Sequence, residues 1–113
     1  MDDQPVWLTT RRGRLLSVPY PQELNDSAAI IGRHVNAAEF ADMIVDQFDE
    51  MLLQSQERPL VMGISLHAMI AGQPFRLRQL RRAFAHLARH RESTWLTTAG
   101  EIAEHWIAAS HSA

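Results

Sequence analysis

Residues 60–72 read LVMGISLHAMIAG and are mostly apolar up to a histidine. The run from Pro59 to Leu66 is mostly apolar and has the length of a strand, which in an α/β protein is typical of a central strand covered on both faces. His67 follows directly. Ligands of parallel α/β folds bind at the carboxyl ends of the strands, so we expect His67 at the mouth of the scaffold. A histidine there can act as a general acid or base near neutral pH, and the alternative is a structural histidine.

A helix is predicted directly downstream, because Gln73-Pro74 places proline at a first helical turn, where its missing N–H costs nothing. The predicted buried face holds Leu77, Leu80, Phe84 and Leu87. His86 and His90 have the i, i+4 spacing that can chelate zinc, but on a helical wheel they lie opposite those apolar residues. We therefore expect the two histidines on a solvated face and predict no metal ligands.

Upstream, Asn36 and Glu39 form a capping-box pattern that predicts a helix running to about Ser55. Apolar residues recur in this segment at spacings of three and four, as in a helix with one buried stripe. They are Phe40, Met43, Ile44, Phe48, Met51 and Leu52. Thr98 with Glu101 predicts the start of a last helix in the same way.

The remaining segments predict strands and a loop. Val6 to Thr10 and Leu15 to Tyr20 are β-type runs around the turn residues 11–14, which indicates a hairpin. A loop is expected from there to about Val35, and a short strand at Thr94 to Thr97, with Trp7 and Trp95 buried or at a rim. Helices alternating with strands after the hairpin predict an α/β fold with the order α-β-α-β-α.

Length and composition limit the classes of function. With 113 residues the chain predicts a single domain, 1–113. A net charge of −2 gives no field that attracts nucleic acid or an anionic membrane, so neither is an expected partner. The absence of cysteine excludes disulfides and thiolate chemistry. No apolar run is long enough for a membrane span and the N-terminus has no signal-peptide pattern, so we expect a cytoplasmic protein.

A second group of polar candidates follows the hairpin. Glu23, Asn25 and Asp26 lie just after a predicted strand, where they can hydrogen-bond a polar substrate, and a carboxylate there can orient His67. The alternative is that Asn25 and Asp26 only cap a turn. Asp2 and Asp3 precede the first strand and either bind a metal or belong to a frayed terminus.

Five segments together resemble the C-terminal part of the polysaccharide deacetylase (NodB-homology) superfamily, and most of all its allantoinase-like branch, which acts on small amides and ureides. They are DDQPVW, LLSVPYPQELND, FADMIVDQFDEML, MGISLHAMIAGQPFRLRQLRR and WLTTAGEIAEHW. The resemblance implies a distorted (β/α) barrel, here partial, that hydrolyses a carbon–nitrogen bond, often with a divalent metal. It implies that His67, in the Leu66-His67 motif, is the acid for the leaving amine. It also implies a substrate pocket lined by Asp3, Glu23, Asn25 and Asp26.

The departure from the family concerns its N-terminal half, whose aspartate-rich and His-x-x-x-His motifs supply the base and the metal ligands. We find no counterpart of these two motifs in this sequence. We therefore expect the chain to be the last part of a barrel, which carries the acid and is inactive alone. The expected substrate of the hydrolase is a small amide, a ureide or an N-acetyl compound. The cofactor stays open, since the family can use a divalent metal. The alternative is a non-catalytic binding or assembly module on the same scaffold. Because an open piece of barrel leaves a sheet edge uncovered, we also expect a homo-oligomer.

Overall fold

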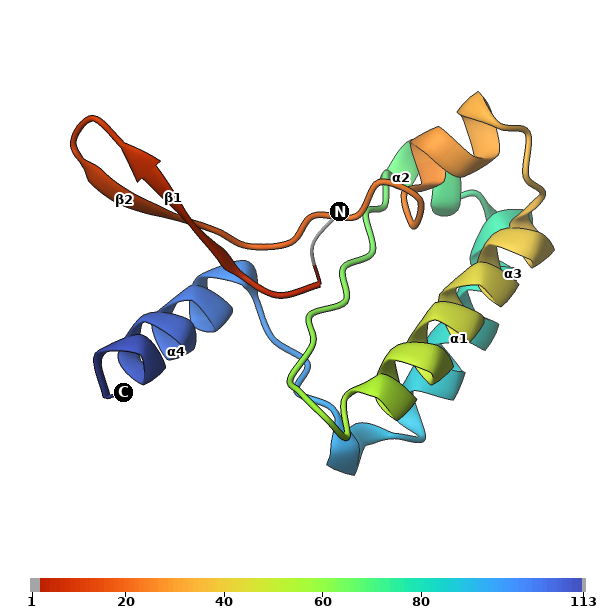
Figure 1. Ribbon diagram of the computed structural model, residues 1–113. Coiled ribbons are helices and arrows are strands. Elements are labelled where there is room, and N and C mark those ends of the chain that lie inside the picture. The colour runs from red at the N-terminus through yellow and green to blue at the C-terminus, as the bar shows by residue number, and fades with distance from the viewer. Residues whose placement is uncertain (1–2, 113) are drawn as a thin grey trace.

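The computed structural model describes residues 3–112 and is mixed α/β, with an antiparallel hairpin followed by helices (Figure 1). The elements are β1 (Val6–Thr10), β2 (Gly13–Ser17), the π-helix η1 (Ser27–Gly32), α1 (Ala37–Gln54), α2 (Ala68–Ala71), α3 (Pro74–Ala88), the 3-10 helix η2 (Arg91–Ser93) and α4 (Ala99–Ser112). The predicted α/β class, hairpin and three long helices are confirmed. Among the described residues, no helix has the length and apolar content needed to cross a membrane.

The hairpin is tighter than predicted. Thr10 pairs with Gly13, and Trp7 pairs with Leu16 on the same ladder. Gly13 has φ +123°, a backbone conformation that favours glycine and lets the chain turn within two residues. The second strand therefore runs over Gly13–Ser17 rather than from Leu15 to Tyr20. The proline at position 19 has no N–H for the ladder, which explains the early end.

Helix α1 begins at the predicted capping box. Asn36 Oδ1 accepts the Glu39 backbone N–H at 2.8 Å, and Asn36 Nδ2 donates to Glu39 Oε1 at 2.7 Å. The helix ends at Gln54, as expected. The loop predicted up to Val35 is wrong in part, since residues 27–32 form η1. Its first turn is stabilised by Asn25 Oδ1, which accepts the Ser27 N–H at 3.0 Å.

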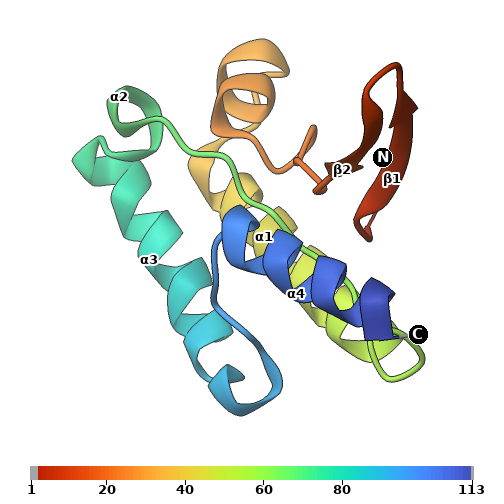
Figure 2. The same cartoon turned by 90° about the vertical axis from the view of Figure 1, so that its left-hand side faces the viewer.

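The core lies where α1 packs against α3 and η1 (Figure 2). Its buried residues are Leu24, Ala29, Ile30, Phe40, Ala41, Ile44, Phe48, Ala83 and Leu87. The predicted stripe of α1 is confirmed at Phe40, Ile44 and Phe48. The predicted face of α3 is wrong at Phe84, which is 41% exposed, whereas Ala83 is fully buried. A small residue at the contact lets the two helix backbones approach, so the larger ring lies outside.

The segment 59–66 is extended but is not the central strand that its composition predicts. Its only ladder contact among the described residues is a parallel bridge between Ser65 and Asn25. Ser65 N donates to Leu24 O at 2.9 Å, and Asp26 N donates to Ser65 O at 3.1 Å. The segment is partly buried rather than covered on both faces, and Leu66 is 40% exposed. A strand requires a hydrogen-bonded neighbour along its length, and within the described residues this segment makes backbone-to-backbone hydrogen bonds with other segments only at Ser65 and at Val61, whose N–H donates to Asp3 O at 2.7 Å.

The strand predicted at Thr94 to Thr97 is also wrong. These residues form an extended link between η2 and α4, without strand pairing. Trp95 is 57% exposed and Leu96 is 68% exposed, so the expected buried or rim position of this tryptophan is wrong, whereas Trp7 is partly buried. The helix that follows is capped as predicted, since the Glu101 N–H donates to Thr98 Oγ1 at 3.2 Å.

The molecule is open for its size. Its radius of gyration is 15.7 Å, whereas a compact domain of this length has a value of about 13 Å. The α1–α3 pair with α2 lies to one side in Figure 1, and the hairpin and α4 lie to the other. The extended segment 94–97 connects the two sides, whereas segment 59–66 runs from the end of α1 to α2.

Candidate acid–base site at His67

His67 lies where the extended segment 59–66 enters α2, and its side chain is 47% exposed. The expected exposure is therefore confirmed. The residues after it begin with the single helical turn of α2. A Cβ added at Gly72 would lie 2.3 Å from the Ala68 carbonyl oxygen, so only glycine fits between α2 and α3. This close turn fixes the backbone at the end of α2, the helix that follows His67.

Asp26 is the partner of His67. Its side chain is fully buried, and Oδ1 lies 2.7 Å from His67 Nδ1. Its other oxygen, Oδ2, accepts the backbone N–H of His67 at 2.7 Å and that of Ala71 at 3.3 Å. One carboxylate therefore holds both the imidazole ring and the backbone from which the ring projects.

The surroundings of Asp26 favour its charged form. Burial raises the pKa of Asp26, but the hydrogen bonds from the backbone and ring of His67, and from the backbones of Ser27 and Ala71, lower it further, to a net value below the ordinary 3.8. The carboxylate is thus ionised at neutral pH and can only accept hydrogen bonds. His67 Nδ1 must then carry a proton, and Nε2 is the ring nitrogen left to exchange one with a ligand.

Within the described residues, no hydrogen bond joins His67 to the other predicted substrate-binding residues. The side chain of Asn25 accepts the Ser27 N–H at the start of η1, as a turn-forming residue does. Asp3 pairs with Arg58 at 3.4 Å. Asp3 and Glu23 line a hollow of about 650 Å³ beside α1, and His67 is not part of its lining. Their roles stay predictions, and Asp2 lies outside the described residues.

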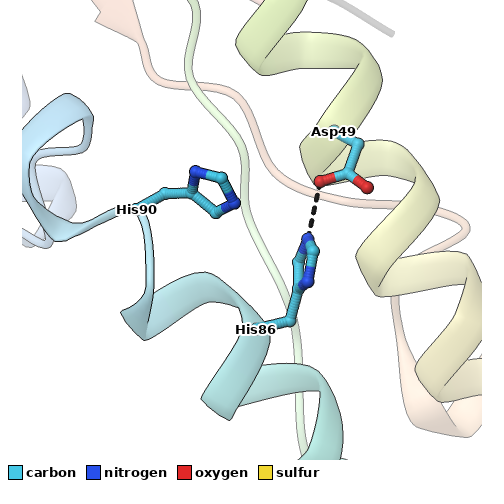
Figure 3. Close-up of side chains that lie close together, drawn as sticks. All are labelled: Asp49, His86 and His90. Carbon is cyan, nitrogen blue, oxygen red and sulfur yellow. Dashed lines mark hydrogen bonds and ion pairs between the residues drawn. The ribbon is translucent and has the colours of Figure 1, made fainter.

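The prediction of a solvated face for His86 and His90 is wrong. Both are partly buried, and both rings pack against Phe48 of α1. His86 Nε2 lies 2.6 Å from Asp49 Oδ1, a partner that sequence spacing alone does not reveal (Figure 3). The reason is that α3 presents Ala83 and Leu87 to α1, which brings His86 to the same side. The i, i+4 spacing of the two histidines was the feature of the sequence that could have indicated this cluster.

The fold of the chain is similar to two solved structures. The chain is 31% identical to Puue allantoinase with a TM-score of 0.87, over 95% of this chain and 36% of that one. It is 28% identical to a probable polysaccharide deacetylase from Pseudomonas aeruginosa PAO1, with a TM-score of 0.80, over 93% of this chain and 36% of that one. No family model and no curated protein matches the sequence.

These similarities confirm the resemblance to the C-terminal part of the polysaccharide deacetylase (NodB-homology) superfamily. These two structures are named as an allantoinase and a probable polysaccharide deacetylase. The chain spans only 36% of the length of each of these two structures.

Proposed function

We propose that His67, oriented by Asp26, is the general acid of a hydrolase that cleaves carbon–nitrogen bonds other than peptide bonds. One observation carries this proposal: a fully buried carboxylate lies 2.7 Å from Nδ1 of a half-exposed imidazole. A carboxylate in this position fixes the ring and its tautomer and stabilises the protonated ring. The substrate class is a small amide, a ureide or an N-acetyl group.

The chemistry that this pair supplies is proton transfer to the leaving nitrogen. The doubly protonated ring of His67 gives its Nε2 proton to that nitrogen as the carbon–nitrogen bond breaks, so the nitrogen leaves as a neutral amine. The ring returns to its neutral form, with Nδ1–H still donated to Asp26. The backbone N–H groups of His67 and Ala71 hold Asp26 in place throughout.

We assign the general acid to this chain, but not the base or the metal ligands. Within residues 3–112, the one group of three His, Asp or Glu side chains able to share a metal ion does not include His67. Asp26 is already engaged by His67 and Ala71. These residues do not fit the metal that family members often use, so no step is assigned to it. We therefore propose that the chain is inactive alone. We also propose that it and its substrate are cytoplasmic.

The test has two parts. The isolated chain is assayed on allantoin and on an N-acetylated oligosaccharide, with and without Zn²⁺ or Mn²⁺, and no turnover is expected. The chain is then fused in place of the matching C-terminal part of Puue allantoinase, and hydrolysis of allantoin is measured. The fusion should be active, and His67→Ala should lower its kcat by roughly 100- to 10,000-fold, the usual contribution of a general acid.

His105→Ala in the same fusion is the matched control, because this histidine lies on the exposed side of α4, and it should leave kcat unchanged. A fusion that keeps its activity in His67→Ala would contradict the proposal. A folded fusion without activity in any form would favour the binding or assembly module instead.

A further inference from the structure

Three side chains of metal-ligating type meet between α1 and α3, at the opposite end of α3 from His67. They are Asp49 of α1, His86 near the end of α3 and His90 just after it (Figure 3). One ligand atom of each lies within 4.8 Å of the other two. Helix α3 has 15 residues and is therefore about 22 Å long, so this cluster is separate from the acid–base site.

The packing of α1 on α3 brings the cluster together. His86 and His90 are one helical turn apart, and their ring centroids lie 5.3 Å from each other. Phe48, which is 6% exposed, packs edge-on against His86, with ring centroids 6.1 Å apart, and in a tilted arrangement against His90, with ring centroids 5.5 Å apart. The residue next to Phe48 is Asp49, so the turn of α1 that provides the apolar wall also provides the carboxylate.

The arrangement limits solvent and leaves one side open. The side chain of His86 is 25% exposed and that of Asp49 is 51% exposed. His90 is held where the chain leaves α3, because its carbonyl oxygen accepts the Thr94 hydroxyl at 2.8 Å and the Ser93 N–H at 3.0 Å. An ion can therefore reach the three side chains from solvent while Phe48 covers their inner side.

We propose that Asp49, His86 and His90 bind one Zn²⁺ ion that links α1 to α3. Two imidazoles and one carboxylate suit zinc, whereas Mg²⁺ and Ca²⁺ prefer oxygen ligands. Ligand bonds of about 2.0–2.1 Å in tetrahedral geometry separate the ligand atoms by roughly 3.3 Å. The 2.6 Å contact between His86 and Asp49 opens slightly, and the ring of His90 turns inward, to reach that spacing. Water takes the fourth position.

The zinc site is independent of the proposed hydrolase function. Zinc would replace the hydrogen bond between His86 and Asp49 and would add His90, which makes no side-chain hydrogen bond within the described residues. It would stabilise the α1–α3 core at the end remote from His67. The ion is a structural link and takes no part in the proton transfer.

Zinc binding is measured by isothermal titration calorimetry of the whole chain, and the geometry by the visible spectrum of the Co²⁺ form. We expect one ion per chain and the absorption of a tetrahedral Co²⁺ site. His90→Gln should weaken binding by at least the roughly 10- to 100-fold that the loss of an outer-shell partner costs. This variant keeps the hydrogen bond between His86 and Asp49, so circular dichroism should show a folded chain.

Two controls complete the test. His67→Ala and His105→Ala remove other histidines and should leave the affinity for zinc unchanged. A tenfold excess of Mg²⁺ over Zn²⁺ should not compete. Undiminished zinc binding in His90→Gln, or no binding by the wild-type chain at millimolar zinc, would overturn the proposal.

Discussion

The α1–α3 side of the molecule and the hairpin–α4 side are built from the same kinds of element but differ in what they bury. The buried apolar residues of the core all lie within 24–48 and 83–87. In β1, β2 and α4, no residue whose burial the structure describes is buried. Leu15 of the hairpin is 58% exposed, and Ile107 of α4 is 37% exposed. The first side is thus stabilised by its own contacts, and the second presents apolar surface.

The difference separates local from tertiary determinants of structure. A hairpin and a capped helix form from local sequence, and both occur on the exposed side. A core requires that several elements cover one another, and only η1, α1 and α3 do so. The candidate site belongs to the covered side, since Asp26 is the residue at which η1 begins and is fully buried.

The largest expected effect is loss of the core contact of Ile44. Its side chain is fully buried on α1, so Ile44→Ala should lower the free energy of unfolding by about 2–5 kcal/mol. Leu96→Ala on the other side removes an exposed side chain and should change it by less than about 0.5 kcal/mol. Urea unfolding followed by circular dichroism measures both. Equal losses of unfolding free energy in the two variants would contradict the difference in burial between the two sides.

Asp26→Asn should have the next largest effect and should depend on pH. The charged hydrogen bonds that Asp26 accepts are each worth about 1.5–3 kcal/mol, and the variant should lose an amount of that order at neutral pH. Because the pKa of Asp26 is lowered in the folded protein, its contribution to stability is complete above the ordinary 3.8 and is lost as the pH falls through the folded value.

The measurement is the unfolding free energy of wild type and Asp26→Asn between pH 7 and pH 2. The gap between the two should close at the acid end. A gap that is constant over this range would show that the charge of Asp26 does not stabilise the folded state.

Part of this architecture could be predicted from the sequence because its causes are local. The capping pairs at Asn36 and Thr98, and proline at position 74, each begin a helix at the expected residue. The exposure of His67 also followed from its position after an apolar run. These features depend on residues that are neighbours in the chain.

The remainder depended on contacts between distant segments. An apolar run forms a strand only beside a hydrogen-bonding neighbour along its length, whereas segment 59–66 has an isolated bridge at Ser65 and one further backbone-to-backbone bond at Val61 within the described residues. The predicted buried face of α3 included the large Phe84, whereas in the structure Ala83 lies at the close contact with α1. This error in the predicted face placed His86 and His90 on the solvated side. The pairing of Asp26 with His67 was considered from the sequence, but only the fold shows how a residue 41 positions away reaches the ring.

The smallest expected effect on folding concerns the exposed side, which we propose associates with a second copy of the chain. Leu96→Glu places a charge on this side and should shift sedimentation from a dimer toward a monomer at micromolar concentration, with little change in stability. Leu53→Glu alters a similarly exposed leucine of α1 and should leave the assembly unchanged. A wild-type chain that sediments as a monomer at micromolar concentration would contradict the association.

The orientation of His67 by Asp26 is tested most directly by the tautomer of the His67 ring, measured by long-range ¹H–¹⁵N NMR of the ring nitrogens at a pH where the ring is neutral. The 2.7 Å bond to the ionised Asp26 predicts that the proton resides on Nδ1 and that Asp26→Asn weakens this preference. A wild-type ring that is protonated on Nε2, with the same tautomer in Asp26→Asn, would show that Asp26 does not orient His67.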